Sequence, residues 1–307
     1  CLRCRSSAPP AHCTARWGRS RRAVSSGGPE PRPRARARPL AHPPAGDRPS
    51  ARTASGLPRR VAADAALALG FLTIVPVPAV DPGPGGIGRA AAWFPLVGAV
   101  VGALAAGVRA ALQPALGALP ATVLAVGALV AVTGALHQDG LADTADGLGA
   151  RGGGPERRLA AMRDSAIGAY GVLALVGWAL LLVSTLAELS TAHAVAALVT
   201  AAAVGRWAAL LHAVAAPPAR PDGLGASFDV GRWRLGFATA AAAALALILC
   251  GIAAGLASLA GGVATPALMT LFARRTLSGR TGDTLGATVA LTELAICVAL
   301  AAAWQPS

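Results

Sequence analysis

Seven apolar runs, separated by short polar stretches, dominate the chain from residue 61 onward. Six of them approach the roughly 20 residues that a helix needs to cross a bilayer, and a shorter one contains Pro266. The runs occupy residues 91–112, 117–136, 169–187, 193–216, 235–257, 259–273 and 285–304. Because lipid offers no hydrogen-bond partner to the backbone, runs of this length form helices. We therefore predict an all-α, polytopic integral membrane helix bundle of about seven transmembrane helices.

The stretch that precedes these runs, residues 61–80, is expected not to cross the membrane. It carries an aspartate and ends in two prolines, so we predict an interfacial or re-entrant helix. The arginines of the polar loops 137–168, 217–234 and 274–284 then share one side with the N-terminal tail, and the opposite side has only Arg109. Since arginine-rich loops stay in the cytoplasm, we expect these loops to face it.

The N-terminal tail, residues 1–60, has a different composition from the rest of the chain. It holds 14 of the 27 basic residues but only two acids, and otherwise consists mainly of Pro, Ala, Ser and Gly. Such a segment buries too little apolar surface to offset the entropy of ordering. Binding to nucleic acid or anionic lipid is possible for an arm of this kind. We predict a disordered tail without a defined role and no nucleic-acid partner, followed by a membrane-embedded domain over residues 61–307.

The polar run 137–147 (HQDGLADTADG) directly follows an apolar run and carries Asp139, Asp143 and Asp146. Spacings of four and three place these carboxylates on one face of a helix, where they repel one another unless a cation lies among them. Oxygen ligands without a nearby cysteine favour Mg²⁺ over Zn²⁺. We predict that the three aspartates bind Mg²⁺ and act in catalysis on a phosphate or pyrophosphate substrate. His137 is either a base or substrate contact, or a helix-end residue that contacts carbonyls.

Two further polar segments carry groups that suit phosphate oxygens. In residues 156–171, Arg158 and Arg163 are candidates for charge-assisted phosphate contacts, and Asp164 for a metal or hydroxyl contact. Residues 274–287 alternate glycine with threonine and arginine before an expected helix start, which suits an anion cradle. The candidate substrate-binding residues there are Arg275, Arg280, Thr281 and Asp283. Asp283 would either cap that helix or bind the cation.

Two charged residues, Arg206 and Glu293, interrupt apolar runs. A charge in lipid is costly, so both are expected to face a polar interior, either as substrate contacts or as a structural pair between helices. The chain contains no lysine, which excludes a lysine nucleophile or Schiff base.

Taken in their order, these segments resemble the cobalamin synthase family, the adenosylcobinamide-GDP ribazoletransferases. The matching stretches are FLTIVPVP at 71–78, WFPLVG at 93–98, HQDGLADTADG at 137–147, MRDSAIGAYG at 162–171, GRW at 205–207, GLGASF at 223–228 and RTGDTLGA at 280–287 with Glu293. Any one of these stretches is weak alone, whereas the ordered set, over residues 64–304, is specific. The resemblance implies a Mg²⁺-dependent inner-membrane enzyme that joins adenosylcobinamide-GDP to α-ribazole or its 5′-phosphate, releases GMP and forms adenosylcobalamin or its 5′-phosphate. It also implies contact with membrane lipid and with other enzymes of late cobamide assembly.

Two other functions remain open from the residues alone. A CDP-alcohol phosphotransferase also uses membrane helices, carboxylates and a divalent ion, but that class resembles D-G-x2-A-R, and here no arginine follows Asp143 before Arg151. A membrane transporter would place Arg206 and Glu293 on a permeation path. Nucleotide release separates these functions, because each transferase releases its own nucleotide and a transporter releases none.

Overall fold

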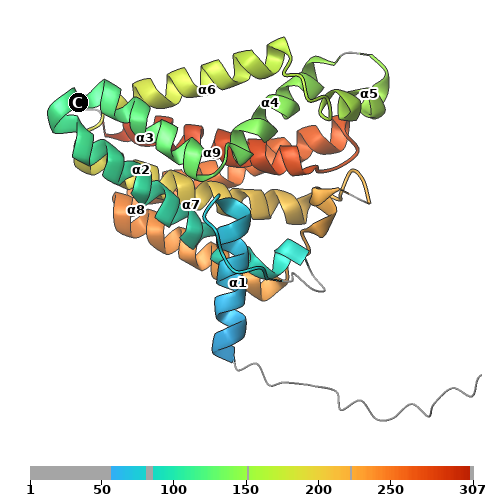
Figure 1. The fold of residues 1–307 in the computed structure, drawn as a ribbon, viewed down its shortest axis with the longest axis horizontal. Coiled ribbons are helices and arrows are strands. Elements are labelled where there is room, and N and C mark those ends of the chain that lie inside the picture. Colours follow the sequence, from blue (N-terminus) through green and yellow to red (C-terminus); the bar gives the residue numbers. More distant parts are fainter. Residues whose placement is uncertain (1–56, 81–85, 151, 222, 305–307) are drawn as a thin grey trace, which may run out of the picture. The chain divides into compact units, whose positions relative to one another are not determined.

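The structure, a computed structural model, describes residues 57–80, 86–150, 152–221 and 223–304. Within these ranges the chain forms α-helices and two short 3-10 helices, without a β-strand (Figure 1). The helices are α1 (Leu57–Leu72), α2 (Phe94–Leu116), α3 (Ala118–Val132), α4 (Leu136–Gly149), α5 (Gly154–Ala161), α6 (Ala169–Ala187), α7 (Thr191–Ala215), α8 (Arg232–Thr276) and α9 (Gly282–Ala303), with η1 (Gly86–Trp93) and η2 (Leu224–Ser227). The predicted all-α membrane fold is confirmed. Residues 1–56 of the predicted tail lie outside the described residues.

Within the described residues, five helices are long and apolar enough to cross a membrane, namely η1 with α2, then α6, α7, α8 and α9. A further candidate span results if α3 and α4, which meet at an angle of 88°, form one bent span. We treat α3 as the apolar part of this pair. The carboxylate-bearing α4 lies outside the membrane-spanning segments, because three aspartates do not fit a lipid environment.

Helix α8 accounts for two of the predicted spans, because its 45 residues fold back on themselves at Gly251. This glycine has a φ of 75°, in the region that favours residues without a Cβ. The two halves are in contact, since a Cβ at Gly255 would lie 2.8 Å from the carbonyl oxygen of Ala246. The break falls several residues before the boundary near 258 that hydropathy predicts.

Helix α7 lies at the centre of the bundle, packed against α2, α8 and α9. Small residues permit this packing, as is common for helices in lipid. A Cβ at Gly98 of α2 would lie 2.3 Å from the carbonyl oxygen of Ala202, and one at Gly102 would lie 2.5 Å from that of Leu198. The α2–α7 contact therefore depends on two glycines spaced four residues apart.

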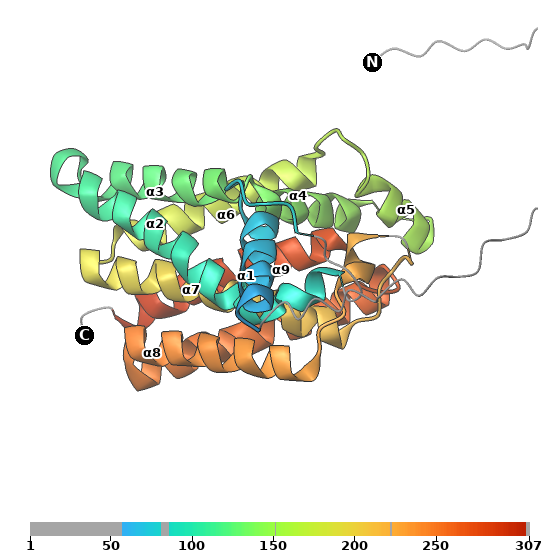
Figure 2. The same cartoon turned by 60° about the horizontal axis from the view of Figure 1, so that its bottom comes forward.

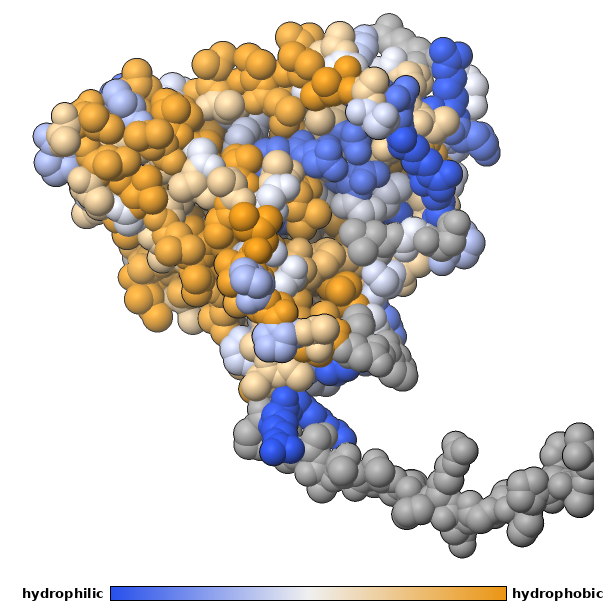
Figure 3. Space-filling view, in the orientation of Figure 1, coloured by the Kyte–Doolittle hydropathy of each residue, from blue (hydrophilic) through white to orange (hydrophobic). Residues whose placement is uncertain are grey.

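The polar segments gather at one end of the bundle, to the right in Figure 1, where α5 and the loops around η2 lie. Backbone hydrogen bonds join two of these loops, since the amide of Ala219 donates to the carbonyl of Arg280 at 2.8 Å. Arg220 donates to the carbonyl of Leu159 at 3.0 Å and so joins the α5 region. Figure 3 shows hydrophobic surface over most of the bundle and hydrophilic surface toward this end. The polar loops therefore share one side, as their arginines predicted.

Helix α1 runs across the direction of the other helices in Figure 1 and is foreshortened in the view of Figure 2. Its end is held by an aromatic cluster in which Phe71 lies 6.0 Å from Phe94 and 5.7 Å from Phe228, between ring centroids. An ion pair between Asp64 and Arg89, at 2.6 Å, joins the helix to η1. A helix with this orientation fits the expected interfacial or re-entrant segment.

Candidate active site

The start of α9 packs closely against α4, and two glycines make this contact possible. A Cβ at Gly140 would lie 2.6 Å from the carbonyl oxygen of Asp283, and a Cβ at Gly286 would lie 3.1 Å from that of Leu136. Any larger residue would separate the helices. The close approach brings the aspartates of α4 beside Asp283 at the start of α9.

Three carboxylates gather at this contact: Asp139 and Asp143 from α4, and Asp283 from α9. Asp139 is exposed, whereas the other two are half-buried. Burial, followed by the negative charges of Asp139, Asp283 and Asp146, together raises the pKa of Asp143 to about 6. The site therefore concentrates negative charge that a cation would stabilise.

Asp146 makes contacts that its spacing did not predict. Its Oδ2 accepts a hydrogen bond from the amide of Gly168 at 2.8 Å, and its Oδ1 accepts one from the amide of Gly171 at 2.9 Å. These amides belong to the first turn of α6, where a negative charge is favourable. A Cβ at either glycine would lie within 2.5 Å of the carboxylate, so both glycines make room for it. Asp146 caps α6.

The expected metal triad of Asp139, Asp143 and Asp146 is consequently not preformed. Among the residues that the structure describes, no three His, Cys, Asp or Glu side chains are placed so that they could hold a metal ion. The expected set loses Asp146 to α6 and has Asp283 as a neighbour instead. Asp139, Asp143 and Asp283 are the carboxylates that remain at this contact.

A cavity of about 220 Å³ adjoins these carboxylates. Three arginines line it: Arg163 from the segment after α5, Arg220 from the loop after α7, and Arg280 just before α9. Asp283, Thr281 and Gly282 from the start of α9 also line it. We call this the arginine–aspartate cavity. Its chemistry suits a phosphate that contacts guanidinium groups and, through a cation, carboxylates.

The first turn of α9 is fixed by a capping box. The Thr281 hydroxyl accepts a hydrogen bond from the amide of Thr284 at 3.2 Å, and the Thr284 hydroxyl accepts one from the amide of Thr281 at 3.0 Å. His212 of α7 contacts the same Thr284 hydroxyl at 3.0 Å and Thr270 of α8 at 2.8 Å. Thr281, Asp283 and their cavity are therefore held by the bundle core.

Two predicted phosphate-binding arginines instead bind backbone carbonyls. Arg158 donates to the carbonyls of Gly147 and Leu148 at 3.1 and 2.9 Å and so caps the end of α4. Arg280 is buried and donates to three carbonyls of the loop between α7 and α8, those of Ala216, Gly225 and Phe228. Both arginines position the walls of the site.

Two other predicted contacts lie on the surface. Arg275 is exposed in the last turn of α8. Asp164 is exposed, and its Oδ1 accepts a hydrogen bond from the amide of Ala166 at 3.0 Å, which forms a local turn. Neither residue lines the arginine–aspartate cavity.

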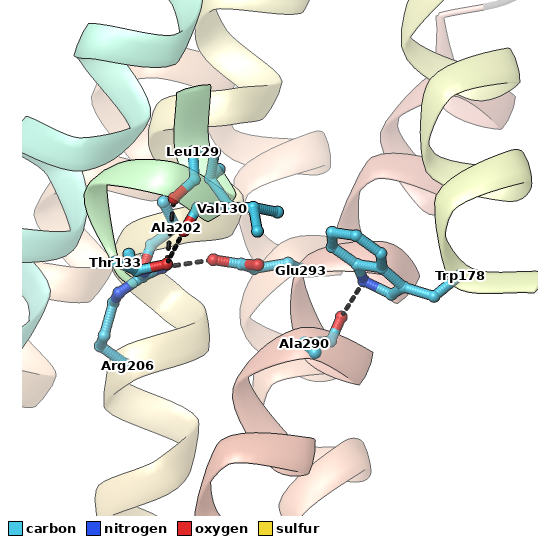
Figure 4. Close-up of polar contacts among 8 residues, drawn as sticks. All are labelled: Leu129, Val130, Thr133, Trp178, Ala202, Arg206, Ala290 and Glu293. Atoms are coloured by element: carbon cyan, nitrogen blue, oxygen red, sulfur yellow. Dashed lines mark hydrogen bonds and ion pairs between the residues drawn. The ribbon is translucent and has the colours of Figure 1, made fainter. Parts of the chain in front are cut away.

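Arg206 and Glu293 form a buried ion pair between α7 and α9 (Figure 4). The guanidinium of Arg206 also donates to the carbonyl of Ala202 at 3.0 Å. Nε and Nη2 of Arg206, Oε2 of Glu293 and Nδ1 of His137 have no hydrogen-bond partner among the residues that the structure describes. Arg206 and His137 line a cavity of about 40 Å³, which is large enough for water. The ion pair supports the interpretation of Arg206 and Glu293 as a structural pair between helices. His137 faces the same small cavity as Arg206.

Sequence reasoning did not assign Arg220 to the site. The loop PPARPD that carries it has neither apolar periodicity nor a glycine pattern, so nothing distinguishes this arginine from an ordinary cytoplasmic charge. One feature of the sequence could have indicated that Asp283 lies beside the carboxylates of α4. The glycines Gly140 and Gly286 each occur in a polar motif and permit two helices to approach closely.

Comparison with known proteins identifies relatives over most of the chain. A sequence model of the family described as cobalamin-5-phosphate synthase matches residues 64–301. An adenosylcobinamide-GDP ribazoletransferase of Rhizobium etli is 42% identical over 260 residues, which are 79% of this chain and 97% of the relative. A protein of the same name from Brucella melitensis is 38% identical over 263 residues, 77% of this chain and 95% of the relative. No solved structure matches.

Proposed function

The chain belongs to the cobalamin-5-phosphate synthase family, and we propose that it joins α-ribazole or its 5′-phosphate to adenosylcobinamide-GDP with release of GMP. The relatives at 38–42% identity are named for a ribazole transfer to adenosylcobinamide-GDP. The chain is a multi-pass membrane enzyme of cobalamin biosynthesis. The alternatives of a CDP-alcohol phosphotransferase and a transporter have no support among these relatives.

The arginine–aspartate cavity is the observation that carries the proposed chemistry. A pyrophosphate ester needs positive groups around its non-bridging oxygens and a cation that compensates charge on the leaving oxygen. The cavity places Arg163 and Arg220 together with the amide-rich first turn of α9, and it adjoins the aspartates of α4. Guanidinium groups and carboxylates therefore lie together at one opening on the polar end of the bundle.

In the proposed reaction a ribose hydroxyl of the acceptor attacks the phosphorus attached to cobinamide. The new P–O bond forms as the bond from that phosphorus to the GMP oxygen breaks, with the two oxygens in line. Arg163 and Arg220 hold the pyrophosphate oxygens, and the first turn of α9 orients them. The hydroxyl proton passes to a carboxylate, and Asp139 and Asp143 are the candidates because both oxygens of Asp146 are bound to α6.

We propose that Asp139, Asp143 and Asp283 hold Mg²⁺. Their oxygen atoms suit this ion, and their mutual repulsion favours a cation among them. A preformed three-carboxylate cage is not required, because Mg²⁺ keeps several waters and is usually bound by one or two carboxylates together with substrate phosphates. When bound, the ion would neutralise charge on the pyrophosphate and on the departing GMP.

We further propose that the enzyme lies in the cell inner membrane with this cavity facing the cytoplasm. The argument is the arginine asymmetry. Arg163, Arg220 and Arg280 line one cavity, whereas Arg109 donates to the carbonyls of Leu186 and Leu189 at the C-terminal end of α6. A cytoplasmic cavity would be accessible to a soluble GDP-activated substrate. It would also be accessible to other enzymes of late cobamide assembly, which we propose as partners.

The decisive assay is GMP release from adenosylcobinamide-GDP by purified, reconstituted protein with α-ribazole as acceptor. We expect Asp143→Asn and Arg220→Gln each to reduce turnover by at least tenfold, because each removes a charge that faces the pyrophosphate. Asp164→Asn is the matched control, since it changes an exposed aspartate of the neighbouring segment that lies outside the cavity. Its turnover should equal that of the unsubstituted protein.

Three results would contradict the proposal. The first is release of CMP from a CDP-alcohol in place of GMP from adenosylcobinamide-GDP. The second is substrate transport without nucleotide release. The third is near-normal turnover of the Asp143→Asn and Arg220→Gln variants, which would place the chemistry outside this cavity.

A further inference from the structure

A second, larger hollow lies on the outer face of the bundle, between the end of α7 and both halves of α8. Its volume is about 580 Å³, within the range of roughly 300–1,000 Å³ that is typical of sites for small molecules. Val214 of α7 and Val263 and Leu271 of α8 line it and are exposed. We call it the α7–α8 groove. Its walls are apolar and open toward the surroundings of the bundle.

One end of the groove carries a positive charge. Arg274, in the last turn of α8, is its one charged lining residue among the described part of the chain. Leu235, in the first turn of α8, also lines the groove, because the hairpin at Gly251 brings the two ends of α8 to the same side. This side is the polar end of the bundle, where the cytoplasmic loops lie.

An interfacial anchor occurs at the same end of α8. Trp233 is two-thirds exposed, and the guanidinium of Arg234 lies 5.1 Å from the centre of its ring. Trp and Arg side chains of this kind lie at the level of lipid headgroups. The charged end of the groove is therefore at headgroup depth, and the apolar walls extend from it toward the lipid interior.

We propose that the α7–α8 groove binds an anionic phospholipid of the cytoplasmic leaflet. One acyl chain occupies the apolar walls, and the headgroup phosphate contacts Arg274. Charge complementarity favours this occupant, because basic pockets between transmembrane helices on the cytoplasmic side suit anionic headgroups. A free phosphate would leave the apolar walls unused. In a zwitterionic lipid such as phosphatidylcholine, the headgroup ammonium already balances the charge of the phosphate, so its attraction to Arg274 is weaker.

The proposal can be tested with the full chain in vesicles of equal phosphatidylglycerol and phosphatidylcholine. Native mass spectrometry of the extracted protein then counts the lipids that remain bound. We expect phosphatidylglycerol to be retained about fivefold over phosphatidylcholine, the ratio that corresponds to about 1 kcal/mol for one basic group near the headgroups. Arg274→Gln should abolish this preference. Arg275→Gln, at an exposed neighbour outside the groove, is the matched control and should preserve it.

A second pair of variants tests the apolar walls. Ala267→Trp places an indole inside the groove and should abolish retention of the lipid, whereas Leu268→Trp places one on an exposed position of the same helix outside the groove. Preserved GMP release would verify that each variant is folded. Equal loss of preference in the Arg274 and Arg275 variants would overturn the proposal in favour of general attraction to the membrane. Displacement of the lipid by inorganic phosphate would overturn it in favour of an ion site.

Discussion

Replacement of Asp146 separates a helix cap from a metal ligand. Both carboxylate oxygens bind amides in the first turn of α6, at 2.8 and 2.9 Å. Loss of a helix cap costs about 0.5–2 kcal/mol, and hydrogen bonds to a charged group contribute about 1.5–3 kcal/mol each when fully formed. Because Asp146 is half-buried and water can reach the freed amides, we expect Asp146→Ala to lower the free energy of unfolding by about 2 kcal/mol. Asp146→Asn keeps one acceptor oxygen and should lower it by about 1 kcal/mol.

The assay pairs thermal unfolding in detergent with GMP release measured against Mg²⁺ concentration. A cap leaves the cation untouched, so the Asp146→Asn variant should be less stable but should require the same Mg²⁺ concentration for half-maximal turnover. The matched control is Ser190→Ala at the start of α7, where the hydroxyl accepts one longer bond of 3.3 Å from the amide of His193. That variant should lose less than about 1 kcal/mol.

The opposite pattern would refute this reasoning. If Asp146→Asn left the unfolding temperature unchanged but raised the Mg²⁺ requirement, as we expect of Asp143→Asn, the carboxylate would act on the cation. The contacts with Gly168 and Gly171 would then not persist in the working enzyme.

Three further outcomes follow from the same contacts. Gly140→Ala should reduce GMP release by at least tenfold, because its Cβ would lie 2.6 Å from the backbone of α9, whereas Gly127→Ala, with open space around the new Cβ, should not. Burial and neighbouring carboxylates raise the pKa of Asp143 to about 6, so protons compete with the cation below that pH. The Mg²⁺ concentration for half-maximal GMP release should therefore decrease as the pH rises from about 5 to about 7. Glu293→Gln should lower the free energy of unfolding by about 3–5 kcal/mol, as measured by unfolding in detergent, because it leaves the charge of Arg206 buried and uncompensated; adding Arg206→Met should restore part of the loss.

The membrane helices could be predicted from the sequence because length and hydropathy are sufficient for that purpose. The break within α8 could not be placed in the same way. The residues around Gly251 are almost all Ala, Gly, Leu and Ile, so the apolar run is continuous in sequence. The turn depends on the positive φ of one glycine among several, a choice that the packing of the two halves decides.

The sequence was sufficient to predict which segments form the candidate site, but not which groups each side chain contacts there. The spacing of Asp139, Asp143 and Asp146 indicates a shared helix face, and it cannot show that α6 begins beside the last of them. The same limit applies to arginines. Arg158 and Arg280 have the charge that a phosphate site needs, yet their guanidinium groups donate to backbone carbonyls. A side chain's partner depends on the tertiary packing, which the local pattern does not contain.

Tertiary packing also determines the hydrogen bonds of His212, which braces the site. The hydroxyl of Thr284 donates to the carbonyl of Thr281 at 3.1 Å and accepts the amide of Thr281, so its remaining capacity is as an acceptor. His212 must then donate to it from Nε2, and its Nδ1 accepts from the hydroxyl of Thr270. A neutral imidazole with its proton on Nε2 satisfies both contacts. Since Thr270 also lines the α7–α8 groove, one hydrogen-bonded chain of three side chains connects the membrane-facing groove with the first turn of α9, where Asp283 faces the arginine–aspartate cavity.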